Sequence, residues 1–137
     1  MGRPVVWESV TLVGVAEQAR AARDFVGGIL GPGHPCREEA VLLVTELFAN
    51  SVRHSCSGAP GETVTVAVST ANGIVRVQVT DRSGPGVPHL RPARAHAECG
   101  RGLALVACLA TQWGWRRLDC RTVTWFDLAQ DAPGCRG

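Results

Sequence analysis

Two segments in the first half of the chain have the spacing of amphipathic helices. Residues 16–30 place apolar side chains three and four positions apart, and the sequence GPGHP at 31–35 ends that pattern. Residues 36–55 show the same period more strongly, until SGAPG at 57–61. The apolar face of this second segment is formed by Val41, Val44, Phe48 and Val52. We therefore predict two consecutive helices.

Alternating apolar and polar residues predict the strands. The candidate strands are residues 5–13, 63–69, 74–81, 113–118 and 122–128. The dipeptide Asn72-Gly73 predicts a tight hairpin turn between the second and third of them, because both central positions of such a turn favour Asn and Gly. The last two candidates are close enough to form a second hairpin.

The order of these elements predicts the fold. Residues 82–100 contain several prolines and no sustained period, and a short, very apolar helix is expected at 102–111. The sequence of strand, two helices, hairpin, loop, helix and hairpin predicts an α+β fold, a two-layer α/β sandwich with helices on one face of a mixed, mostly antiparallel sheet. We expect one domain over residues 1–130 and a frayed tail at 131–137.

Composition acts mainly by exclusion. A chain of 137 residues with 45% hydrophobic residues suits one packed domain, and a formal net charge of +2 is too small to make nucleic acid or an anionic membrane the main partner. All 14 basic residues are Arg, which excludes a Walker-type phosphate loop and Schiff-base chemistry, since both need a Lys. The sequence shows no membrane-length apolar run and no signal-like N-terminus, so we expect a cytoplasmic protein.

The six cysteines are scattered without a CxxC pair. In a reducing compartment they are expected to be buried small hydrophobes or free thiols. A zinc site built from His34, Cys36, His54 and Cys56 is a weaker alternative, because its spacing matches no usual ligand pattern.

Three groups of residues carry candidate chemistry, and the first is on the helix predicted at 36–55. Glu46 and Asn50 are one turn apart on the same face, and Arg53 and His54 extend this stripe, which is expected to lie opposite the apolar face. An amide oxygen suits Mg²⁺, a carboxylate can accept a proton from a nucleophile, and a basic group can neutralise phosphate. Taken alone, the stripe is explained more simply as the solvated face of an ordinary amphipathic helix, because short motif matches are weak evidence.

The second group lies at the end of the strand predicted at 74–81. Asp81 is in phase with the alternating valines, so the strand directs a carboxylate toward the core at its C-terminal end. A buried carboxylate needs a hydrogen-bond donor, which an adenine amino group would supply. Gly84 and Gly86 follow and allow close approach of backbone to a flat base. The alternative is a strand that ends in a turn.

The third group is Gly100-Arg101-Gly102, which leads into the apolar helix predicted at 102–111. Glycines before a helix leave backbone N–H groups open to an anion, assisted by the helix dipole. A glycine-rich entry to a buried helix is the simpler explanation of this group by itself.

In this order the three groups resemble the GHKL ATPase/kinase superfamily. TELFANSVRHS resembles its N box, DRSGPGVP its first glycine box, and GRGLALVACLATQWGW its second. More narrowly, the chain is similar to the bacterial anti-sigma regulatory factor/serine-threonine kinase family of stand-alone HATPase domains, abundant in actinomycetes. The resemblance extends from about residue 10 to 128 and implies the Bergerat ATP-binding fold.

The resemblance also implies a role for each motif residue, with ATP and Mg²⁺ as cofactors. Asn50 would bind Mg²⁺ and Glu46 would be the general base, with Arg53 and His54 near the phosphates. Asp81 would recognise the adenine amine, in a base pocket shaped by Gly84 and Gly86. The phosphates would meet Arg101, Gly102 and the N–H groups of Leu103 and Ala104, beneath an ATP lid at residues 87–99.

The chain departs from the superfamily pattern at two points. Position 83 is Ser where the pattern D-x-G-x-G has Gly, and Gly84 and Gly86 form a shifted G-P-G version of it. The superfamily also places a Thr of a late strand near the adenine. Thr122 and Thr124 are both candidates, and the sequence does not choose between them.

The function implied is transfer of the ATP γ-phosphate to a Ser or Thr of an anti-sigma-factor antagonist, with a sigma factor as the competing partner. The alternative is a catalytically weak or inactive ATP-binding module that acts by binding these partners. A fragment of a two-component histidine kinase ranks third, because the sequence shows no dimerisation helix with a phosphoacceptor His. Family members often form homodimers through the first strand, and the resemblance extends that option to this chain.

Overall fold

The computed structural model describes residues 6–54, 61–82, 106 and 108–130. A short 3₁₀ turn at Ala16–Gln18 leads into helix α1, Ala19–Leu30, and helix α2 covers Arg37–His54. The strands are β1 (Trp7–Val13), β2 (Thr63–Ala71), β3 (Ile74–Arg82), β4 (Gln112–Leu118) and β5 (Arg121–Ala129). Each predicted helix and strand in these ranges is therefore confirmed, with ends that shift by a few residues.

The strands form one sheet in the order β1-β2-β3-β5-β4, and all described pairs are antiparallel. The expected mixed sheet thus contains no parallel pair among the described strands. The reason is the position of β5, which lies between β3 and β4 and is antiparallel to both. The predicted turn at Asn72-Gly73 is also confirmed, since both residues have positive φ.

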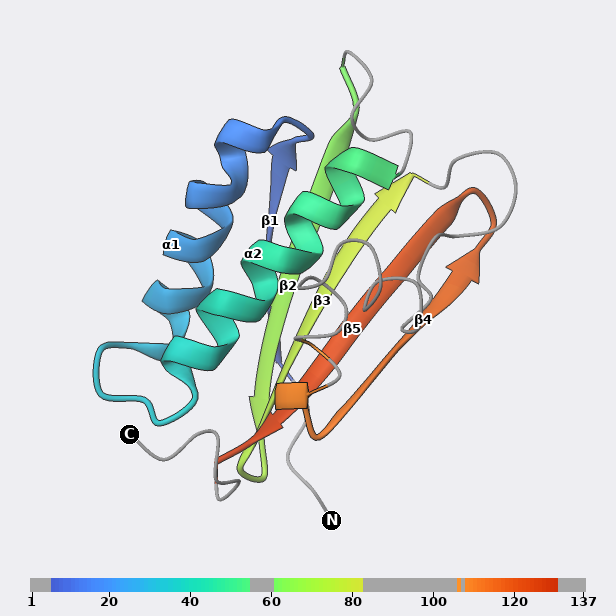
Figure 1. The fold of residues 1–137 in the computed structure, drawn as a ribbon. Helices are drawn as coiled ribbons and strands as arrows, with labels where there is room; N and C mark the ends of the chain where they lie inside the picture. Colours follow the sequence, from blue (N-terminus) through green and yellow to red (C-terminus); the bar gives the residue numbers. More distant parts are fainter. Residues whose placement is uncertain (1–5, 55–60, 83–105, 107, 131–137) are drawn as a thin grey trace.

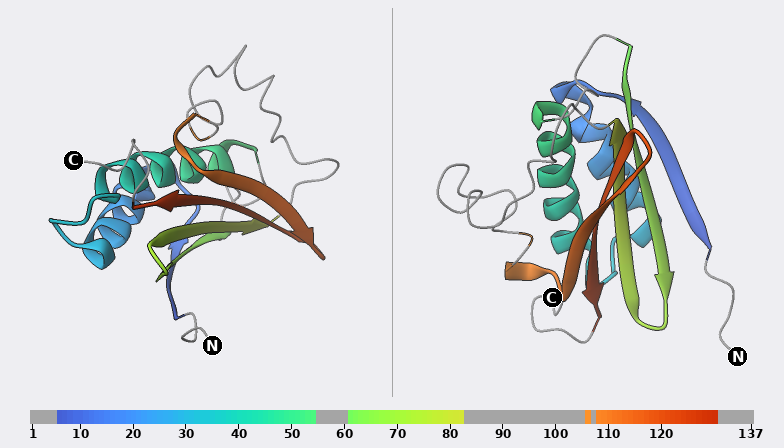
Figure 2. Two further views of the ribbon diagram at one scale, coloured as in Figure 1. Left: turned by 90° about the horizontal axis from the view of Figure 1, so that it is seen from below. Right: turned by 90° about the vertical axis from the view of Figure 1, so that its right-hand side faces the viewer.

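Both helices lie on the same face of the sheet, over β1, β2 and β3, while β5 and β4 extend beyond α2 (Figures 1 and 2). Valines at every second position of β2 and β3 are fully buried beneath them, which is the expected alternation of a sheet covered on one face. The sandwich predicted from the element order is therefore confirmed.

The buried face of α2 differs in detail from the prediction. Val44 and Phe48 are fully buried as expected, but Val41 and Val52 are only half-buried. The buried positions of α2 are Ala40, Leu43, Val44, Leu47, Phe48 and Ser51. The core face is rotated by about one residue because α2 contacts α1 as well as the sheet.

The opposite face of the sheet carries a stacked polar cluster. The guanidinium of Arg76 donates to both carboxylate oxygens of Asp127, at 2.6 and 2.8 Å, and lies 4.2 Å from the centre of the Trp125 ring. Trp125 in turn packs against Gly114, where an added Cβ would lie 3.2 Å from the ring. Bidentate pairing and stacking fix β3, β5 and β4 relative to one another.

Some predictions concern residues outside the described ranges. They include most of the helix expected at 102–111, of which Val106 is fully buried in the core, and the tail at 131–137. Within the described ranges, no helix combines the length and apolar character of a membrane span.

Phe48 anchors α2 in the core, so Phe48→Ala is expected to lower the free energy of unfolding by about 3–5 kcal/mol, through lost burial and the cavity left behind. Leu42→Ala is the matched control on the same helix, because Leu42 is 42% exposed and should change stability by less than about 1 kcal/mol. Urea unfolding of both variants checks this. Equal losses in the two variants would contradict the assignment of the core face.

Candidate nucleotide site

Asp81 is the buried charged group at the centre of the candidate site. It precedes the last residue of β3 and shares a face with Val75, Val77 and Val79, as the strand pattern predicts. Its residue is only 5% exposed, and its Oδ1 atom has no hydrogen-bond partner in the described part of the chain. An unpaired buried oxygen costs free energy, so this position is suited to a ligand that donates a hydrogen bond.

Asp81 accepts a side-chain hydrogen bond from the hydroxyl of Ser51 on α2. The Ser51 side chain donates to the carboxylate and favours its charged form, but burial outweighs this contact and raises the pKa of Asp81 to about 6. Ser51 is not among the site residues predicted from the sequence. Its signal was a polar residue at a core position of an amphipathic helix.

The sheet register resolves the choice between the two threonines. Thr122 of β5 lies directly opposite Asp81, whereas Thr124 lies opposite Val79. Both threonines are buried and point to the helix-covered face, because directly paired residues share a face. Thr122 is therefore the threonine beside Asp81, and Thr124 is one row deeper.

The α2 stripe lies on the flank of the helix, not opposite the core face. Glu46 and Asn50 are both half-buried there, and Arg53, one turn later, is exposed. His54 is the last residue of α2, and its side chain lies outside the described part of the structure. Because Ser51 contacts Asp81, the turn of α2 that contains Asn50 and Ser51 lies next to Asp81.

The predicted glycine-box residues lie outside the described part of the chain. Gly84, Gly86, Arg101, Gly102, Leu103 and Ala104 all lie outside the described residues, as do Ser83 and the lid expected at 87–99. The described part of the site thus consists of the Asp81 carboxylate on β3, the hydroxyls of Ser51 on α2 and Thr122 on β5, and the side of α2 that carries Glu46 and Asn50.

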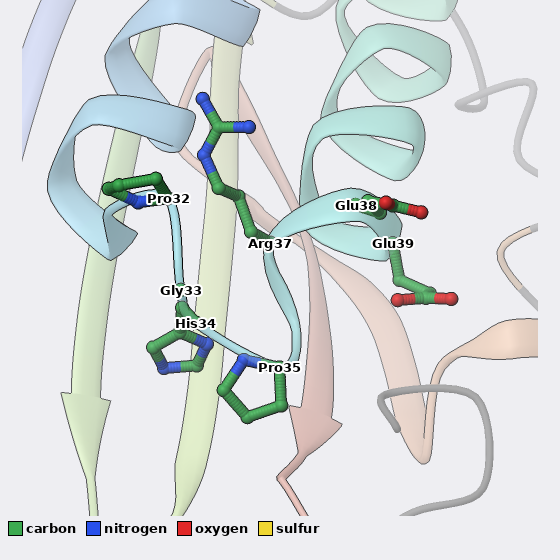
Figure 3. Close-up of a pocket in the computed structure, with 7 residues that line it drawn as sticks. All are labelled: Pro32, Gly33, His34, Pro35, Arg37, Glu38 and Glu39. Atoms are coloured by element: carbon green, nitrogen blue, oxygen red, sulfur yellow. The ribbon is translucent and has the colours of Figure 1, made fainter. Parts of the chain in front are cut away.

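A separate hollow of about 330 Å³ lies at the other end of α2, along the loop that joins it to α1 (Figure 3). Arg37 points from this hollow toward α1, where its Nε donates to the Gly27 carbonyl at 3.2 Å. His34 accepts the Cys36 N–H through Nδ1 at 3.0 Å. Thirteen residues of helix separate Arg37 from Asn50, about 20 Å, so this hollow is not part of the candidate nucleotide site.

The alternative zinc site is not formed. His34 and Cys36 precede α2, whereas His54 is its last residue, about 27 Å away along an 18-residue helix. Cys56 lies outside the described residues. No cluster of three or more potential metal ligands occurs among the residues that the structure describes.

Two comparisons with known proteins bear on this site. A family model described as a histidine kinase-like ATPase domain matches residues 13–127. The crystal structure of the RsbU and RsbW domains of Rv1364c from Mycobacterium tuberculosis is similar with a TM-score of 0.66 and 22% identity. That match covers 92% of this chain and 33% of the other, so this chain spans about a third of that structure. No curated protein matches the chain.

The raised pKa of Asp81 predicts a pH effect on stability. Because the folded-state pKa lies above the ordinary value of 3.8, its contribution to stability is fully present below about pH 4 and is lost as the pH rises through 6. Asp81→Asn removes this loss. The free energy of unfolding of the variant, relative to the unaltered chain, should therefore rise by on the order of 1–3 kcal/mol between pH 4 and pH 7.

Urea unfolding at several pH values measures this difference. Asp24→Asn, at an exposed position of α1, is the matched control and should give a nearly constant difference. A flat profile for Asp81→Asn as well would show that Asp81 titrates normally in the folded chain.

Proposed function

The chain belongs to the histidine kinase-like ATPase domain family, and on that premise we propose that it is an anti-sigma type of protein serine/threonine kinase. It binds ATP and transfers the γ-phosphate to a Ser or Thr of an antagonist protein. The observation that carries this proposal is the buried Asp81 carboxylate with its unpaired Oδ1, beside the helix flank that holds Glu46 and Asn50.

Asp81 recognises adenine through its Oδ1 atom, which has no hydrogen-bond donor among the described residues. The N6 amine of adenine donates to Oδ1, while Ser51 continues to donate to the carboxylate. Thr122, directly across the sheet, borders the same base. Gly84 and Gly86 shape the rest of the base pocket.

The flank of α2 handles the phosphates. The side-chain oxygen of Asn50 is a hard neutral ligand that fits Mg²⁺, which supplies charge neutralisation to the phosphates when it is bound. Arg53 and His54, the last residues of α2, supply basic side chains that can pair with the phosphates. Arg101, Gly102, Leu103 and Ala104 complete the phosphate site through backbone N–H groups at a helix N-terminus.

Glu46 is the proposed general base. Its carboxylate accepts the proton of the acceptor hydroxyl as that oxygen forms a bond to the γ-phosphorus and the bond to the ADP oxygen breaks. Glu46 is half-buried on a helix that is packed in the core, so its carboxylate is held in place and stays accessible to a substrate.

The proposed partners are a sigma factor and an anti-sigma-factor antagonist, met in the cytoplasm, with a homodimer of this chain as the assembled form. The likeness to a structure of RsbU and RsbW domains supports a regulatory partner protein rather than a metabolite as acceptor. Neither direct nucleic-acid binding nor membrane binding forms part of the proposal. If catalysis is weak or absent, the same nucleotide site serves a module that acts by partner binding.

Asp81→Asn is expected to reduce the preference for ATP over GTP by about 10–100-fold at pH 7.5. Guanine presents a carbonyl where adenine has an amine, so the native carboxylate repels it, while an Asn amide can donate to it. Calorimetric titration with both nucleotides measures the preference, with Asp24→Asn as the control. An unchanged preference would remove Asp81 from base recognition.

Glu46→Gln is expected to lower phosphoryl transfer by about 10²–10⁴-fold while nucleotide binding stays within about twofold, because Gln keeps the shape but accepts no proton. Radiolabelled ATP with candidate antagonist proteins measures transfer, and Glu38→Gln, exposed on the same helix, is the control. Asn50→Ala is expected to weaken ATP binding when Mg²⁺ is present, because it removes the proposed metal ligand. It should leave ATP binding unchanged when a chelator removes Mg²⁺. Tight partner binding with no transfer by the unaltered chain would favour the inactive module.

A further inference from the structure

Three arginines meet at one corner of the open sheet face, opposite the helices. Arg82 of β3 lies directly across from Arg121 of β5, and Arg121 lies across from Leu118 of β4. Arg116, two residues before Leu118, is diagonal to Arg121 on the same face. We call Arg82, Arg116 and Arg121 the arginine corner; all three are exposed.

Among the described residues, one ion pair offsets part of this charge. Glu62 accepts from Arg82 at 2.9 Å. Within the described residues, Arg116 and Arg121 take part in no ion pair, although Asp119 lies in the turn between β4 and β5. Like charges directly opposite one another destabilise a sheet, so the Arg82–Arg121 pair works against folding. The formal net charge of the chain is only +2, so the corner is a local concentration.

The corner adjoins an open strand edge. β4 is the last strand of the sheet, and no described strand pairs with its outer side (Figure 1). Leu118 at the end of β4 is 50% exposed and Trp115 is 39% exposed. An edge with no partner strand among the described residues, with exposed apolar side chains and nearby arginines, suits an extended peptide that adds as a strand.

We propose that the β4 edge and the arginine corner form a docking surface for an extended acidic peptide segment of a partner protein. Main-chain hydrogen bonds to β4 hold the peptide, its acidic side chains pair with Arg116 and Arg121 on one face, and its apolar side chains cover Trp115 on the other face. This surface goes beyond the proposed kinase activity and needs no nucleotide. Nucleic acid fits less well, because a phosphate backbone cannot form the main-chain hydrogen bonds of an added strand.

The test uses the full chain without nucleotide and a fluorescent ten-residue peptide of alternating Glu and Val. At low ionic strength, anisotropy should show binding, and the double variant Arg116→Glu/Arg121→Glu should weaken it at least about tenfold. The matched double variant Arg20→Glu/Arg23→Glu changes the net charge equally on the exposed side of α1 and should weaken binding less than about twofold. Methylation of alternate peptide nitrogens should also abolish binding, because it removes the strand hydrogen bonds.

Folding of the corner variant is checked independently. Its thermal midpoint should not fall, since Arg121→Glu replaces a like-charge pair with an opposite one, and Arg116→Gln/Arg121→Gln provides a milder second variant. Absence of peptide binding would overturn the proposal, as would equal weakening by both glutamate double variants. Unchanged binding of the methylated peptide, or tighter binding of a single-stranded oligothymidine of equal charge, would do so too.

Discussion

The buried carboxylate of Asp81, where β3, β5 and α2 meet, carries a free-energy cost that the rest of the structure must offset. Asp81 reaches that position because it continues the buried row of β3, and burial raises its pKa to about 6 despite the Ser51 hydroxyl. Such a group weakens the folded chain at neutral pH. The valine rows and the helices must offset this cost, which a donor from a bound base would also relieve.

α2 serves the core and the site at once. Its buried side fixes the helix on the sheet through Phe48 and Leu47, while Glu46 and Asn50 occupy the adjoining flank. Groups held on a packed helix keep their geometry better than groups on a loop, so the same contacts that stabilise the fold also determine how accurately the flank is placed. Under the proposed function, stability and nucleotide handling are therefore coupled in this helix.

The parts of this arrangement that depend on local pattern could be predicted from the sequence. The alternation of β3 placed Asp81 on the buried face, and Asn72-Gly73 gave the first hairpin. The insertion of β5 between β3 and β4 could not be predicted, because strand order depends on pairing between distant segments. Ser51 and the choice of Thr122 were inaccessible for the same reason, since both follow from how α2 and β5 meet β3.

The central position of β5 also has a consequence for the order of assembly. Asp81 on β3 pairs with Thr122 on β5, the last described strand of the chain. The ribosome therefore synthesises α2, β2 and β3 before it synthesises Thr122. Without β5, β3 would be an edge strand and Asp81 would have no neighbouring strand on that side. The buried environment of Asp81 therefore depends on a non-local pairing between residues 81 and 122, the kind of contact that forms slowly in folding.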